Sequence, residues 1–280
     1  MENSLIVKYL NKNIRLRNEK MIKILRKSIF IILAIFSITF IVTCGKKDNL
    51  DKKEIIEKFI EASENTKSMD GTIDIKTEME LNGNKVVENI SMDSSLILDP
   101  FMMKVEMQVP NHPKILGYLD EEFIYFLNPQ NNKWYKQNMN DLFGKRFKTY
   151  ITNTDPFYDV IKDNIDKIDI EEKNGNYIIS ISKESQIFKK ATEKQISSIN
   201  AIANSSLENE TKIENMSAVY TVDKNTYLTT SSSMSYDLKI PGNGKMTIDV
   251  VCKMRNINKI ENITIPEEAK NATTINNIKK

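Results

Sequence analysis

The sequence predicts an α+β protein built on one continuous, strongly curved antiparallel β-sheet, with helices packed on the concave face of that sheet. Three observations lead to this expectation. Long stretches alternate apolar and polar residues with a period of two, which is typical of antiparallel strands with one buried face. Turns rich in Asn, Gly, Asp and Pro separate these stretches. Segments with the apolar spacing of a helix precede each of two groups of strands.

The first helix is predicted to run from residue 51 to about residue 67. Asp51 is followed three positions later by Glu54, which is the spacing of a capping box at a helix N-terminus. The polar residues of this segment would face water, so its apolar stripe needs a sheet or another helix to cover it. The residues of that stripe are Ile55, Ile56, Phe59 and Ile60.

Strands are predicted on both sides of a second helical region. The first group covers residues 71–81, 90–98, 104–109, 115–119, 123–127 and 133–136. A helix opened by Asp155-Pro156, a hairpin around Asn174-Gly175-Asn176 and a helix over residues 184–205 follow. The second group covers residues 216–222, 227–240 and 246–254. Two smaller helix-plus-sheet domains that meet near residue 150 are the alternative to one continuous sheet.

The N-terminal segment is typical of an export signal. Lys23, Arg26 and Lys27 precede an apolar run from residue 28 to residue 42, which is short for a membrane-spanning helix. The cationic end would stay in the cytoplasm. We therefore predict a signal peptide over residues 1–43, with Met21 as an alternative start, a polar tether over residues 44–50, and a single domain over residues 51–280.

Ile41-Val42-Thr43-Cys44 resembles the lipobox of bacterial lipoproteins, in which the cysteine is acylated and becomes the new N-terminus. Thr43 departs from the Gly, Ala or Ser usual at that position. The resemblance implies lipidation at Cys44, including palmitate-type acyl chains, and a location at the outer face of the cell membrane. The alternative is an uncleaved anchor helix, which would also leave the domain outside the cytoplasm.

The charge balance argues against a nucleic-acid-binding protein. Eight of the 40 basic residues but only two of the 38 acidic residues precede Cys44, so the remainder of the chain has a formal charge of −4. A weakly acidic domain offers phosphates no electrostatic attraction. The other cysteine, Cys252, has no partner if Cys44 is acylated, so the fold must depend on packing rather than on disulfides.

Three stretches together resemble the lipoprotein-carrier-like (LolA/LppX-like) superfamily, which includes uncharacterised lipoproteins of Firmicutes. They are the helix and first strand over residues 54–81, the segment 123–136 with Trp134-Tyr135-Lys136, and the tail from Tyr220 to Ala269. The resemblance implies a half-barrel whose concave side, closed by helices, holds an acyl chain or another hydrophobic molecule. It supplies no catalytic residues, and other members of the fold act as envelope sensors that bind proteins.

The residues themselves give little support to catalysis. His112 is the one histidine and lies between prolines in a predicted loop, whereas metal sites and Ser-His-Asp triads need more than this. Cys252 shares a strand face with apolar residues, which predicts a buried thiol. The carboxylate pairs Glu121-Glu122 and Glu171-Glu172 are expected on polar or turn-like segments, and the serine run 231–233 is expected on the polar edge of a strand. The sequence therefore predicts a protein that is not an enzyme and has no cofactor or metal.

Apolar and aromatic residues are the candidates for binding, because methionine and tyrosine side chains adapt to hydrophobic ligands. Our first hypothesis is a non-catalytic, membrane-anchored protein that binds a lipid or another hydrophobic ligand. The second is an envelope sensor or structural module that recognises a protein partner. The third, an extracellular hydrolase, depends only on the abundance of carboxylates. The candidate ligand-binding residues are Tyr118, Tyr125, Trp134, Tyr220, Tyr236 and Met246.

Overall fold

The computed structural model describes residues 51–81, 83–143, 160–183, 187, 212–240 and 244–275 of the chain. The signal peptide, Met21, Cys44 and the tether predicted from the sequence lie outside the described residues. So do the predicted helix start at Asp155-Pro156 and, apart from Ile187, the helix predicted over residues 184–205. No helix within the described ranges has both the length and the apolar content needed to cross a membrane.

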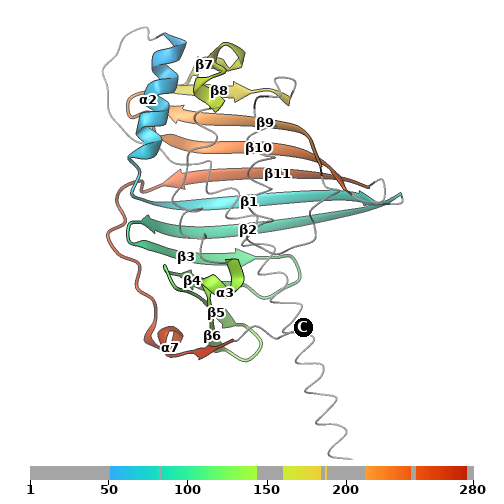
Figure 1. Cartoon of the computed structure of the whole chain (residues 1–280), viewed down its shortest axis with the longest axis vertical. Helices are drawn as coiled ribbons and strands as arrows, with labels where there is room; N and C mark the ends of the chain where they lie inside the picture. Colours follow the sequence, from blue (N-terminus) through green and yellow to red (C-terminus); the bar gives the residue numbers. More distant parts are fainter. Residues whose placement is uncertain are drawn as a thin grey trace, which may run out of the picture.

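All the described strands belong to one sheet (Figure 1). Their order across the sheet is β12-β6-β5-β4-β3-β2-β1-β11-β10-β9-β8-β7. Neighbours are antiparallel except for β12 and β6, which are parallel. The strands are β1 (Ser68–Leu81), β2 (Asn84–Leu98), β3 (Phe101–Gln108), β4 (Ile115–Leu119), β5 (Phe123–Asn128), β6 (Lys133–Asn138), β7 (Asp169–Lys173), β8 (Asn176–Ile181), β9 (Lys212–Asp223), β10 (Thr229–Ile240), β11 (Gly244–Arg255) and β12 (Thr273–Thr274).

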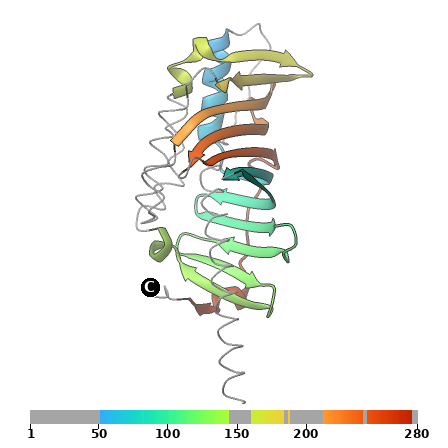
Figure 2. The same cartoon turned by 90° about the vertical axis from the view of Figure 1, so that its right-hand side faces the viewer.

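The pairing of β1 with β11 joins the two groups of strands into one curved sheet (Figure 2). β1 comes early in the chain and β11 late, yet they pair along most of their length, from Asp70 opposite Arg255 to Glu80 opposite Lys245. The predicted fold class, a strongly curved antiparallel sheet with helices against its concave face, is confirmed. The expected alternation explains the arrangement, because each strand places its apolar residues on the same side.

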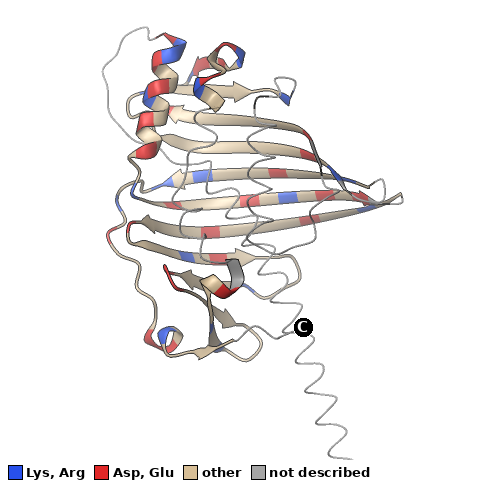
Figure 3. Cartoon of the chain, viewed as in Figure 1, with Lys and Arg blue, Asp and Glu red and all other residues tan. Residues whose placement is uncertain are grey.

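We call the apolar side of the sheet the inner face and the opposite side the outer face. On β1 the inner face carries Ile73 and Ile75, whereas the outer face carries Asp74 and Lys76. The charged residues accordingly occur at alternate positions along β1 and β11 (Figure 3). The methionines follow the same rule, because the register places every strand methionine except Met102 on the inner face.

Helix α2 (Lys52–Glu64) covers one end of the inner face, across the ends of β8 to β10 (Figure 1). Its buried residues include the predicted stripe, and Phe59 meets Tyr220 of β9 edge-to-face with ring centroids 5.4 Å apart. The predicted capping box is wrong: the Asp51 side chain makes no capping hydrogen bond, and Glu54 instead pairs with Lys58. Helix α2 ends at Glu64, earlier than predicted, because Ser68 already begins β1.

The remaining described helices are short. Helix α3 (Met139–Phe143) follows β6, η1 (Ile165–Lys167) precedes β7, and α7 (Glu267–Lys270) follows β11. The segment from residue 256 to residue 272 runs over the outer face of the β3–β6 region. The hairpin predicted around Asn174-Gly175-Asn176 is present, and its turn places Asn174 and Gly175 at positive φ. Short polar or glycine residues tolerate this left-handed conformation best.

Candidate hydrophobic binding site

Burial on the inner face changes from one cross-strand row to the next. The row that contains Ile73 and the row that contains Ile75 are buried in the middle of the sheet, apart from Ile90 at the edge of the second. The register gives the first row as Met92, Ile73, Cys252, Ser232, Tyr220 and Ile179, and the second as Ile90, Ile75, Val250, Met234, Ala218 and Ile181.

The next two rows, towards the tips of the β1–β2 and β10–β11 hairpins, are more exposed. Thr77, Ile248 and Tyr236 are half-buried members of one row, whose ends are the exposed Glu88 and the buried Met216. Val86, Met79, Met246 and Leu238 form the last, in which Met79 and Met246 are half-buried, Val86 is 45% exposed and Leu238 is buried. We call the six residues Thr77, Ile248, Tyr236, Val86, Met79 and Met246 the inner mouth. Because it is apolar, partly exposed and continuous with the buried rows, the inner mouth is the candidate site.

The inner mouth contains two of the six residues predicted from the sequence, Tyr236 and Met246. Tyr236 packs against both of the large apolar clusters on the inner face, the one under α2 and the one across β1–β5 and β11. Its hydroxyl lies 3.4 Å from the sulfur of Met234. A third predicted residue, Tyr220, lies on the same face but is buried under α2, two rows further in.

The other three predicted residues, Tyr118, Tyr125 and Trp134, lie on the outer face of β4, β5 and β6. The segment 256–272 covers them with Ile263, Ile265 and Ala269. The rings of Tyr118 and Trp134 are 5.9 Å apart, in the tilted geometry common between aromatic side chains. The structure therefore does not bring the six predicted residues together, since the sheet separates them into two groups. Their part in ligand binding stays a prediction.

Tyr125 has a structural contact that limits its availability. Its hydroxyl donates a 2.8 Å hydrogen bond to Oδ2 of Asp120. Oδ1 of the same carboxylate accepts the backbone N–H groups of Glu122 and Phe123, which closes the turn before β5. Burial, together with the hydrogen bond to Asp120, raises the pKa of the Tyr125 hydroxyl above its ordinary value of 10.0.

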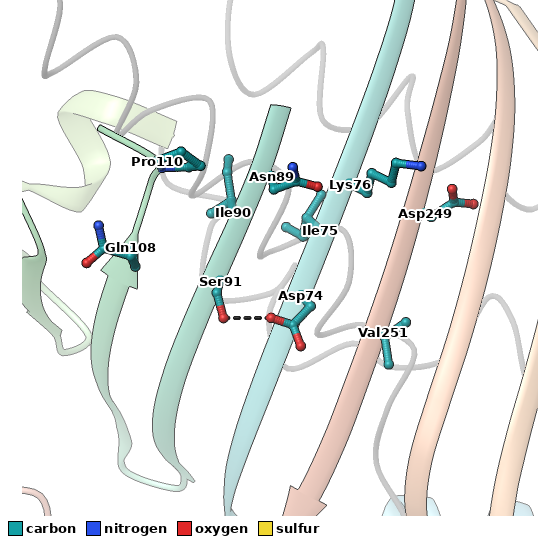
Figure 4. A pocket seen from close by; sticks show the side chains of 10 residues that line it. All are labelled: Asp74, Ile75, Lys76, Asn89, Ile90, Ser91, Gln108, Pro110, Asp249 and Val251. Carbon is teal, nitrogen blue, oxygen red and sulfur yellow. Dashed lines mark hydrogen bonds between the residues drawn. The ribbon is translucent and has the colours of Figure 1, made fainter. Parts of the chain in front are cut away.

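A groove of about 430 Å³ lies on the outer face, across β11, β1, β2 and the end of β3 (Figure 4). Ser91 donates a 2.6 Å hydrogen bond to Asp74 within it. Unlike the inner mouth, this groove also contains charged side chains, those of Asp74, Lys76 and Asp249. The groove residues are Asp74, Ile75, Lys76, Asn89, Ile90, Ser91, Gln108, Pro110, Asp249 and Val251.

Cys252 and the serine run 231–233 lie on neighbouring strands, whereas His112 lies in a loop. Cys252 is buried on the inner face, as predicted, and burial raises the pKa of its thiol to about 12. His112 lies exposed in the loop after β3, as predicted. The prediction for the run 231–233 was wrong in part: β10 is a central strand, and Ser232 is buried on the inner face opposite Cys252. Within the described ranges, no three His, Cys, Asp or Glu side chains are grouped to hold a metal.

Sequence reasoning did not select Met79, Val86 or Ile248 for the site. Each was visible as one position in an alternating strand, but alternation gives the face of a residue and not its depth along the strand. Depth depends on which strands pair and where α2 lies. The sequence signal that could have identified these residues is the length of the β1–β2 and β10–β11 hairpins. Strands that extend beyond the covering helix leave apolar residues exposed at their tips.

The fold and the inner mouth define an α+β protein with a single curved sheet and one partly open apolar face. The chain belongs to DUF6612, a family of unknown function whose model matches residues 51–274. No curated protein matches its sequence.

Two solved structures show the kind of protein that the chain is similar to. The Mycobacterium tuberculosis lipoprotein LppX aligns with 11% identity and a TM-score of 0.37, over 76% of this chain and 98% of that one. A LolA superfamily protein from Nitrosomonas europaea aligns with 6% identity and a TM-score of 0.28, over 78% and 96%. The similarity to the LolA/LppX-like superfamily predicted from the sequence is thus found again.

Proposed function

We propose that the chain is a lipoprotein of the cell envelope, anchored through Cys44 on the outer face of the cell membrane, that binds a lipid or another hydrophobic ligand at the inner mouth. The proposed role is binding without catalysis. The observation that carries the proposal is the change in burial along β1 and β11, from the buried Ile73, Ile75, Val250 and Cys252 to the half-buried Thr77, Met79, Met246 and Ile248.

The chemistry of the inner mouth supports a hydrophobic ligand. Met79 and Met246 are cross-strand partners there, and their flexible thioethers adapt to chains of varied shape. Tyr236 adds a ring with a polar end. A chain inserted at the inner mouth would continue along the apolar residues of the inner face towards Ile75 and Val250. Removing such apolar surface from water is worth about 25 cal/mol per Å².

A second candidate function is recognition of a protein partner, and one observation on the outer face favours it. Val219 of β9 and Val251 of β11 are both cross-strand partners of Ser233, so the two valines flank that serine. They are 36% and 39% exposed. An apolar pair on an otherwise polar surface is a feature of protein interfaces. The pair is small, so the ligand-binding proposal comes first.

Ligand binding is tested on the domain purified without detergent. We expect a hydrophobic fluorophore to bind saturably while the domain stays cooperatively folded, and an acyl ligand to raise the melting temperature by linkage. Native mass spectrometry of the same sample would detect a co-purified ligand. The absence of saturable binding, together with an unchanged melting temperature in lipid extracts, would favour recognition of a protein partner over ligand binding.

The anchor is tested separately. We expect Cys44→Ser to abolish incorporation of labelled fatty acid, and to leave an uncleaved signal-anchored precursor or a form released into the medium. Cys252→Ser is the matched control, because it removes the other cysteine and should leave incorporation unchanged. Equal labelling of the wild type and Cys44→Ser would contradict lipidation at this position.

A further inference from the structure

One charged side chain stands on the inner face beside the inner mouth. Glu88 of β2 is the cross-strand partner of Thr77, and Thr77 pairs in turn with Ile248 of β11. The register therefore places Glu88 on the apolar side of the sheet, at the edge of the same row as Tyr236. Among the described residues of β1, β2, β3, β10 and β11, no other inner-facing position is charged.

Glu88 differs from Glu78 of the same hairpin in its partners. Glu78, on the outer face, pairs with Lys76 at 2.7 Å and with Lys85 at 2.5 Å. Glu88 is exposed and, within the part of the chain that the structure describes, forms neither an ion pair nor a hydrogen bond. The carboxylate thus adds a negative charge to the rim of an apolar surface, and the described residues supply no cation to neutralise it.

We propose that the inner mouth takes an amphiphile tail-first and holds its head group beside Glu88, which favours a positively charged head. This inference rests on the proposed function. At the hairpin end of the inner face Thr77, Met79 and Met246 are half-buried, whereas Phe59 and Tyr220 close the end under α2. A tail buried towards Ile75 therefore leaves the head at the row of Glu88 and Thr77. A cation there gains attraction without the cost of full desolvation.

The test compares three soluble amphiphiles with twelve-carbon tails below their micellar concentrations: dodecyltrimethylammonium, dodecanoate and neutral dodecyl maltoside. Each displaces a hydrophobic fluorophore from the purified domain at low salt. We expect the cation to bind about three- to tenfold more tightly than the anion, the range set by one charge pair near a surface. High salt should reduce the preference by screening.

Two matched variants locate the effect. Glu88→Gln keeps the size of the side chain and should bring the ratio of cation to anion affinity close to one. Glu80→Gln removes a charge from the outer face of the same hairpin and should leave the ratio unchanged. Circular dichroism establishes that both variants are folded.

The outcomes separate this inference from the function on which it rests. Binding of the neutral amphiphile without a preference for the cation overturns the placement of the head group and leaves the proposed function standing. An equal loss of preference in Glu80→Gln overturns it too, because the effect would then come from overall charge. If none of the three amphiphiles binds, the proposed function itself fails.

Discussion

The two ends of the inner face differ although the same strands build both. At the α2 end, Phe59, Tyr220 and Tyr227 are fully buried, and Lys58 lies over the ring of Tyr227, 5.5 Å from its centroid. At the hairpin end, Met79 and Met246 occupy equivalent inner positions but remain half-buried. The packing of other segments over a strand, rather than the composition of the strand, therefore decides whether its apolar face becomes core or binding surface.

The largest effect on stability is expected for a substitution that leaves a cavity at the α2 end of the inner face. Phe59→Ala should lower the free energy of unfolding by about 3–5 kcal/mol, because it leaves a cavity between α2 and β9. Met246→Ala, at the hairpin end, should cost about 1 kcal/mol, since water already reaches part of that side chain. Urea denaturation measures both. Equal losses would show that the two ends are packed alike and would remove the basis for the inner mouth.

Binding gives the sharpest contrast between the two faces at the hairpin end. Val86 and Val87 are adjacent and equally exposed, at 45% and 46%, but the register places Val86 on the inner face and Val87 on the outer face. We expect Val86→Asp to weaken binding of a hydrophobic fluorophore about fivefold or more, since a charge in the apolar site must be desolvated. Val87→Asp should change it little. A comparable loss in both would indicate that the hairpin tip acts as a whole.

Cys252 tests where the closed part of the face begins. Its thiol should resist alkylation at pH 8 until denaturant is added, and Cys252→Ala should cost on the order of 1 kcal/mol. The pKa of about 12 in the folded protein lies above the ordinary 9.0. Folding therefore favours the neutral thiol, and this contribution is complete below pH 9 and is lost as the pH rises towards 12. Rapid labelling of the native protein would show that the exposed part of the inner face extends as far as Cys252.

The smallest effect concerns the outer side of the hairpin end. Hydrogen bonds from Lys76 and Lys85 lower the pKa of Glu78 from 4.5 to about 2. The stabilisation from these pairs is therefore present above pH 4.5 and is lost as the pH falls through 2. A carboxyl-detected NMR titration should place the midpoint of Glu78 near pH 2. A midpoint near pH 4.5 would show that the exposed pairs are not populated in solution.

The sequence determined which face of each strand is apolar, and the structure agrees for Ile73, Met92, Val250 and Cys252. It also determined the main turns, because Asn-Gly sequences favour the positive φ that tight hairpins require. Local chemistry suffices for such features, since they depend on residues close together in the chain.

Only the tertiary structure decided how those faces combine. Tyr118, Tyr125 and Trp134 look as suitable for a ligand as Tyr236 does, yet the tail of the chain covers them on the outer face. The β1–β11 pairing joins residues more than 160 positions apart, and no local pattern specifies such a pairing. The depth of each inner residue follows from that pairing and from the position of α2. The face of a residue is thus a local property with a period of two, whereas its exposure depends on contacts between distant segments.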